Sequence, residues 1–136
     1  MSEASLGKIL LTVTAVYAGA GPFVFDWNRT HIHNPDWPPH AKFHNAQTMS
    51  LGAALSAAAL TAIWGNGRWN RNRLTVAAIA ASLYWGTQLS ASAYPGVSMA
   101  DPPAKTSRLG PQTYVAAVAL VVNAISAVLE HRRVHR

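Results

Sequence analysis

Charged residues divide this chain into four long uncharged stretches. These cover residues 9–25, 43–67, 74–100 and 109–129, with 17, 25, 27 and 21 residues respectively. A helix needs about 17–25 apolar residues to cross a bilayer, and none of the stretches carries the charged stripe of a water-facing amphipathic helix. The pattern therefore predicts four transmembrane helices, over about residues 6–25, 38–64, 74–94 and 111–129.

Small residues recur within these stretches at the spacing of one helical turn. Ala54, Ala58 and Ala62 are four residues apart, and alanines recur in a similar way in the third and fourth stretches. Small residues at this spacing let membrane helices approach closely. Since the chain shows no internal repeat and no domain boundary, we predict one all-α domain over residues 1–136, an integral membrane four-helix bundle.

Composition narrows the possible functions. Half of the residues are hydrophobic and only 12% are charged, against about 25% in a typical soluble domain. The absence of cysteine excludes disulfides, thiolate metal sites and cysteine nucleophiles. The net charge of +6 does not indicate a nucleic-acid partner, because the basic residues gather at the ends of the predicted helices. The expected partner is the lipid bilayer.

The basic residues are distributed unevenly between the two ends of an alternating four-helix arrangement. One end would carry seven of them and the other four. Because positive residues favour the cytoplasmic side, we predict that both termini are cytoplasmic and that the loop after the first helix lies on the outer side, periplasmic or lumenal. The seven are Lys8, Arg68, Arg71, Arg73, Arg132, Arg133 and Arg136, and the four are Arg29, Lys42, Lys105 and Arg108.

The loop after the first helix and the start of the second hold four of the six histidines. His31 and His33 would share one face of an extended segment, and His40 and His44 would share one face of a helix. Imidazole is a good ligand for Zn, Cu and Fe. One hypothesis is therefore that these four histidines bind a transition metal.

A second hypothesis for the same segment needs no metal. His40, His44, Asp26 and Asp36 are candidate general acids and bases, and the two aspartates are also candidates to complete a metal site or to orient a histidine. His40 and His44 begin the second helix and are expected to point into the bundle, at the level where membrane meets water. The structural alternative is a stiff polar turn with solvated histidines.

Polar residues inside or beside the predicted spans suggest a substrate site. A cavity with apolar walls and a polar mouth suits a lipophilic molecule with a polar head. The alternative is that these side chains form hydrogen bonds between helices. The candidates are Asn28, Gln47, Tyr84, Gln88 and Asn123.

The run DWNRTHIHNPDWPPHAKFHNAQ, residues 26–47, resembles a signature of small four-helix membrane proteins of uncharacterised families. In them a W-N-x-T-H…N-P-x-W-P-P-H-A-K-F-H stretch follows the first helix. The resemblance implies no particular activity. It does imply a joint role for five residues, Asn28, Thr30, His31, His40 and His44.

Three classes of function fit these features. The first is an integral membrane enzyme that acts on a lipophilic small molecule at the histidine-rich site, by metal or acid–base chemistry. The alternative is a non-catalytic small subunit or assembly factor of a larger membrane complex, with the tryptophan- and proline-rich loops as docking surfaces; a homo-oligomer is also compatible. A transporter fits less well, because the spans carry no repeated acidic residues and no buried arginine or lysine to carry ions.

Overall fold

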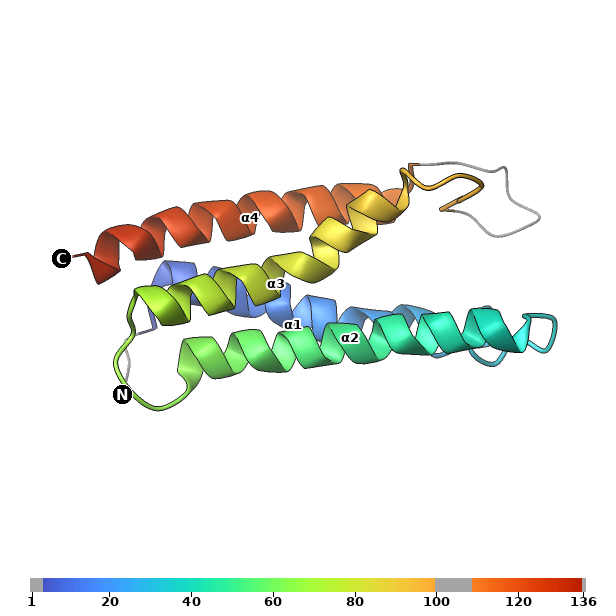
Figure 1. The fold of residues 1–136 in the computed structure, drawn as a ribbon, viewed down its shortest axis with the longest axis horizontal. Helices are drawn as coiled ribbons and strands as arrows, with labels where there is room; N and C mark the ends of the chain where they lie inside the picture. The colour runs from blue at the N-terminus through green and yellow to red at the C-terminus, as the bar shows by residue number, and fades with distance from the viewer. Residues whose placement is uncertain (1–3, 100–108, 136) are drawn as a thin grey trace.

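A computed structural model describes residues 4–99 and 109–135 of the chain, and within these ranges it contains four helices and no strand. The helices are α1 (Leu6–Asp26), α2 (Pro39–Trp64), α3 (Arg71–Ala91) and α4 (Pro111–Val134). They run alternately up and down along one axis (Figure 1). The predicted all-α, four-helix architecture is confirmed. Lys105, Arg108 and Arg136, which contribute to the predicted sidedness, lie outside the described residues.

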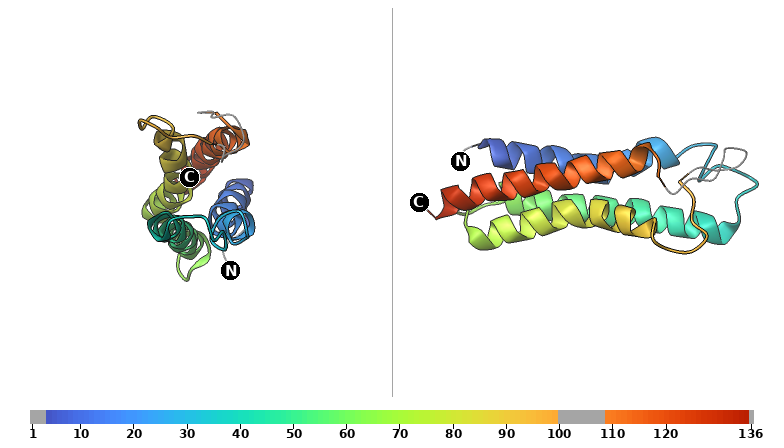
Figure 2. Two further views of the ribbon diagram at one scale, coloured as in Figure 1. Left: turned by 90° about the vertical axis from the view of Figure 1, so that its right-hand side faces the viewer. Right: turned by 90° about the horizontal axis from the view of Figure 1, so that it is seen from above.

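The two ends of the bundle differ in what they carry. One end holds the start of α1, the end of α4 and the turn between α2 and α3, and the other holds the turn between α1 and α2, the end of α3 and the start of α4 (Figure 1). α1 packs against all three other helices, whereas α2 and α4 do not contact each other. Figure 2 shows the same bundle end-on and from above, and all four helices run roughly along its long axis. The histidine-rich turn therefore shares its end of the bundle with the start of α4.

Two helix boundaries differ from the predicted ones for clear local reasons. α3 begins at Arg71 because the Asn70 side chain caps it, accepting a hydrogen bond from the Arg73 backbone N–H at 3.1 Å. α4 continues into the basic tail as far as Val134, and its last turn contains a histidine and two arginines. Positive side chains at this position favour the negative end of the helix dipole.

Three of the four helices are long and apolar enough to cross a membrane, namely α1, α2 and α4. α3 does not reach the same hydropathy, because Gln88 and several serines and threonines lie along it. These polar groups do not all face outward: Ser82 accepts a hydrogen bond from Asn123 of α4 at 3.1 Å. Part of the lower hydropathy of α3 therefore comes from polar side chains that make contacts inside the bundle.

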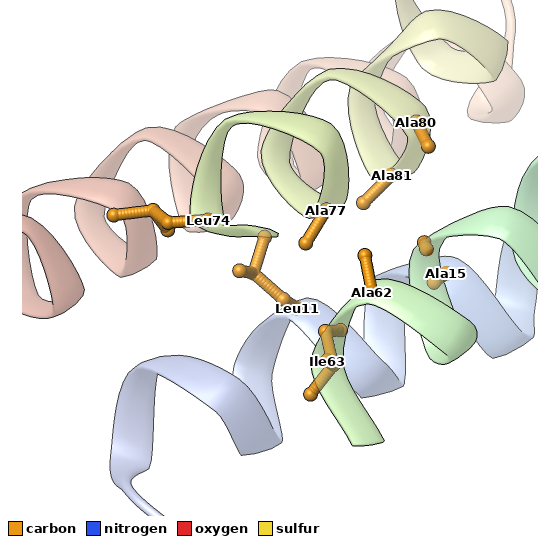
Figure 3. Packing of buried hydrophobic residues seen from close by; sticks show 9 residues of the cluster. Leu11, Ala15, Ala62, Ile63, Leu74, Ala77, Ala80 and Ala81 are labelled. Atoms are coloured by element: carbon orange, nitrogen blue, oxygen red, sulfur yellow. The ribbon is translucent and has the colours of Figure 1, made fainter. Parts of the chain in front are cut away.

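The core is built largely from alanines, which lets the helices lie close together. Ala15, Ala59, Ala77 and Ala81 are at most 1% exposed and pack beside Leu11 and Ile63, as Figure 3 shows. The prediction that small residues mediate helix contacts is thus confirmed for the bundle as a whole.

The buried face of α2 agrees only in part with the predicted one, since Ala62 lies in the core. Ala54 and Ala58 are exposed, and the buried side chains of this helix include Gly52, Ser56 and Ala59. Two of the three predicted alanines are therefore on the wrong face, because alanines occur on every side of α2 and do not by themselves mark the contact.

Gly52 and Gly19 set the distance between α1 and α2. A β-carbon on Gly52 would lie 2.5 Å from the backbone oxygen of Ala18, and one on Gly19 would lie 2.6 Å from the Ser56 β-carbon. The Gly52 contact is the less tolerant of the two, because its neighbour is backbone and cannot rotate away. This close crossing fixes α1 against α2.

We expect Gly52→Ala to destabilise the bundle, because the new methyl group would push α1 and α2 apart. Overpacking of this kind costs about 1–3 kcal/mol. Gly86→Ala in α3 is a matched control, since its β-carbon would meet nothing within 4 Å. Thermal unfolding in mild detergent measures the difference. A Gly52→Ala protein as stable as the Gly86→Ala protein would contradict the proposed close contact.

Candidate functional site

A cleft of about 370 Å³ opens near the end of the bundle that carries the histidine-rich turn. Residues from α1, the following turn, α3 and the start of α4 line it, so it is formed by segments far apart in the sequence. Its volume falls within the range of small-molecule binding sites. The lining residues are Tyr17, Gly21, Pro22, Phe25, Asp26, His31, Tyr84, Trp85, Gln88, Pro111, Gln112 and Val115.

Aromatic rings form much of the wall of this cleft. The Trp85 ring lies 5.4 Å from the Tyr17 ring and 5.2 Å from the Tyr84 ring, measured between centroids. Trp85 is only 3% exposed. Within the described part of the chain, its indole Nε1 and the Gln88 Oε1 are both buried without a hydrogen-bond partner. Tyr84 and Gln88 were predicted to contact a substrate, and both lie in the cleft.

His31 is held in a defined orientation at this cleft. The Thr30 hydroxyl lies 2.6 Å from Asn28 Oδ1 and 2.8 Å from His31 Nδ1. Because the amide oxygen only accepts, the hydroxyl donates to it and accepts from His31 Nδ1–H. In the neutral ring the lone pair is then on Nε2, which is the basic nitrogen. The same ring makes a T-shaped contact with the Trp37 ring, with centroids 4.9 Å apart.

Asp26, the last residue of α1, lines the same cleft as His31. Its Oδ2 accepts a hydrogen bond from the Asn45 side chain of α2 at 3.2 Å. Among the residues that the structure describes, the cleft lining contains no lysine or arginine. A carboxylate and an imidazole are therefore the acid–base groups of the cleft, together with the phenols of Tyr17 and Tyr84.

His40 and His44 form a pair on the first turns of α2, outside the cleft. Their Nε2 atoms lie 3.0 Å apart, and His44 Nδ1 lies 3.3 Å from Gln47 Oε1. With that amide oxygen as acceptor, His44 donates through Nδ1 and, when neutral, accepts from His40 through Nε2. All three side chains are exposed. The expectation that His40 and His44 point into the bundle is wrong, because the buried face of α2 begins at Met49.

The remaining predicted residues of the turn lie apart from this pair. His33 is exposed and its ring packs edge-on against Trp27, with centroids 5.6 Å apart. Asp36 is exposed and donates its backbone N–H to Asn34 Oδ1. Among residues 4–99 and 109–135, no group of three or more histidine, cysteine, aspartate or glutamate side chains is arranged to hold a metal ion.

Asn28 and Asn123, both predicted as substrate contacts, have structural partners. Asn28 Oδ1 accepts the Thr30 N–H at 2.8 Å and so shapes the turn that carries His31. Asn123 is 2% exposed; it accepts from the Thr14 hydroxyl of α1 and donates to the Ala81 backbone oxygen of α3 at 2.9 Å. Asn123 therefore links three helices, as the interhelical alternative describes, and it does not line the cleft.

Sequence reasoning missed a buried polar cluster at the opposite end of the bundle. Glu130 is 1% exposed and accepts hydrogen bonds from Ser5 Oγ at 2.6 Å and Trp69 Nε1 at 2.9 Å. The Lys8 ammonium lies 4.6 Å from the centroid of the Trp69 ring, and Lys8 is 2% exposed. In the sequence analysis Glu130 only delimited an uncharged stretch, and Lys8 counted as one of the basic residues at a helix end. Their position just inside the ends of two helices could have indicated that their side chains are buried.

Trp85 was the other residue missed. It was not predicted as a site residue, although it lies three positions before Gln88 and thus on the same side of a helix. Its neighbours Tyr84 and Gln88 were chosen because they are polar, whereas the indole was taken as part of an apolar stretch. The polar N–H of a tryptophan inside such a stretch was the available signal.

The described residues form a small all-helical bundle with a lined cleft at the histidine-rich end. Residues 10–136 match the model of the family of unknown function DUF6640, and the chain belongs to this family. The predicted resemblance to uncharacterised proteins agrees with this membership, which assigns no activity. No curated protein and no solved structure matches the chain.

Proposed function

We propose that this protein is an integral membrane enzyme that binds a lipophilic small molecule in the end cleft, with His31 and Asp26 as its acid–base groups. The observation that carries the proposal is the cleft itself, which joins an imidazole, a carboxylate and unpartnered polar atoms to aromatic walls. Pockets with apolar walls and a few convergent polar groups are typical of small-molecule sites.

The outer surface of the bundle supports a membrane location. Large apolar side chains project outward along α1 and α4; Val13, Val24, Val118 and Val121 are each between 57% and 71% exposed. Exposed apolar area of this extent is unfavourable in water and fits hydrocarbon. We include α3 as the fourth span, because its polar groups Ser82 and Trp85 face a partner or the cleft within the bundle.

The proposed orientation follows from charge. The end that carries both termini and the turn between α2 and α3 has the larger number of basic residues, and the positive-inside rule favours this end as cytoplasmic. The cleft would then open near the outer, periplasmic or lumenal, surface. A lipophilic substrate would enter from the bilayer, and its polar group would meet the acid–base residues where the bundle reaches water.

The proposed chemistry is proton transfer within the cleft. His31 Nε2 takes a proton from the substrate, at its polar group or at the carbon beside it, and later returns one, while Nδ1–H stays bonded to the Thr30 hydroxyl, which keeps the ring in one tautomer. Asp26 lines the same cleft and is the second group there that can hold or pass on a proton. Aromatic walls keep the reacting group partly out of water.

Metal binding by His40 and His44 is the second candidate function for the histidine-rich end of the bundle. The favouring observation is the 3.0 Å separation of the two Nε2 atoms. Zn–N bonds are about 2.0–2.1 Å long, so both nitrogens can bind one ion in place of their mutual hydrogen bond. Zn, Cu and Fe are the candidate metals. The pair supplies two ligands, and the others would come from water, substrate or another chain.

The acid–base proposal predicts a selective loss of turnover in His31→Gln, which removes the basic nitrogen and keeps a polar side chain. Wild-type protein in lipid nanodiscs is incubated with a lipophilic extract of its membrane, and mass spectrometry identifies the substance that it consumes. We expect His31→Gln to lower this rate at least a hundredfold, the usual scale of general acid–base catalysis. His131→Gln, exposed at the opposite end, is the control.

Two results would argue against this enzyme. A His31→Gln protein as active as the His131→Gln protein would exclude His31 as the acid–base group. Purification in mild detergent with stoichiometric other subunits, and no consumption of any lipophile, would favour the small-subunit alternative instead.

The metal candidate predicts about one metal ion per chain, lost when His40 and His44 are both changed to alanine. The measurement is elemental analysis of protein purified without a histidine tag or chelator. His131→Ala, His135→Ala is a matched control, because these rings also lie one helical turn apart, with centroids 4.2 Å apart. If wild-type protein binds no metal even after reconstitution with Zn, Cu and Fe, the metal candidate is excluded.

A further inference from the structure

We propose that the molecule in the end cleft has a neutral oxygen-bearing polar group, an alcohol or a carbonyl, that accepts a hydrogen bond from Trp85 Nε1–H and contacts the Gln88 amide. This inference rests on the proposed function, in which the cleft takes a lipophile, and it specifies the chemical class of that lipophile.

Trp85 supplies the main evidence. An indole N–H is a donor only. When it is buried without a partner, it has lost its hydrogen bond to water and gained none in the protein, which is energetically unfavourable. Trp85 is 3% exposed, lines the cleft, and its Nε1 has no partner among the described residues. By contrast, Trp64 Nε1 donates to Thr12 and Trp69 Nε1 donates to Glu130, each at 2.9 Å. The Trp85 N–H thus lacks the hydrogen-bond acceptor that the indoles of Trp64 and Trp69 have. An oxygen atom on a bound ligand would provide this acceptor.

Gln88 provides a second buried polar atom that lacks a hydrogen-bond partner. It follows Trp85 by three positions, so both side chains lie on one side of α3. Its Oε1 is buried without a partner, and the residue lines the cleft. A side-chain amide offers both an acceptor and a donor. An alcohol can therefore accept from Trp85 and donate to Gln88, and a carbonyl can accept from both side chains if the amide turns its NH₂ group towards it.

The charge of the described lining residues favours a neutral head over an anionic one. Among them Asp26 is present, and there is no lysine or arginine. Carboxylates and phosphates are bound in proteins mainly by arginine, lysine or clustered backbone N–H groups, and a nearby carboxylate repels them. Neutral oxygen groups meet no such repulsion. The aromatic walls and the volume of about 370 Å³ suit one small lipophile.

The test uses the full chain, with isotope-labelled tryptophan, in phosphatidylcholine nanodiscs. Dodecanol, dodecyl phosphate and dodecane are added in turn, and nuclear magnetic resonance follows the indole N–H signals. The Trp85 signal is assigned by its loss in Trp85→Phe. The Trp64 signal is an internal reference, because this N–H already has a partner.

We expect dodecanol to shift the Trp85 signal in a saturable way, at an at least tenfold lower membrane mole fraction than dodecyl phosphate, and dodecane to shift it little. Gln88→Leu should weaken dodecanol binding about two- to tenfold, the effect of one lost hydrogen bond. Asp26→Asn should narrow the difference between dodecanol and dodecyl phosphate. Unchanged signals of the other tryptophans show that each variant is folded.

Two outcomes would overturn the inference, and they are distinguishable. If dodecyl phosphate binds as tightly as dodecanol or more tightly, the cleft takes lipophiles but not by the neutral group that we infer, and the proposed function stands. If none of the three ligands shifts the Trp85 signal, the cleft does not take a lipophile, and both the inference and the proposed function are wrong.

Discussion

The close contact between α1 and α2 is the constraint on which the rest of the structure depends. Gly52 lies so near the Ala18 backbone that no side chain fits between them. Alanines continue this tight packing through the middle of the bundle. Close packing ends where Gly21, Pro22 and Trp85 occur, and there the cleft opens. The cavity therefore lies where the helices are no longer packed through small residues and aromatic side chains take their place.

Polar groups inside the apolar bundle fall into two kinds. Asn123 and Glu130 are buried with hydrogen-bond partners on other helices, and they hold helices together. Asn45, Trp85 and Gln88 each have a buried polar atom with no partner in the described chain, and of these Trp85 and Gln88 both line the cleft. Since unpaired buried groups are uncommon in native proteins, their occurrence together supports a ligand site better than either residue alone.

The fold could be predicted from sequence because it depends on the spacing of charges along the chain. The bounds of α1 and α2 agree with the predicted ones to within one residue at each end. The orientation of side chains was harder to predict. Two of the three alanines predicted to pack against other helices from α2 are exposed, since alanine occurs on every side, and His40 and His44 were wrongly expected to point inward. Only the assembled bundle brings His31 to α3 and α4, so the cleft could not be derived from the chain alone.

The most direct test of the account is whether α3 crosses the membrane, because the proposed site needs four spans. The chain has no cysteine, so single cysteines can replace Pro35, Asn66 and Val97, three exposed residues in the turns at the two ends. A membrane-impermeant maleimide is added to intact cells. The account predicts labelling at Pro35 and Val97 but not at Asn66. Labelling of Asn66 and Val97 from the same side would contradict it.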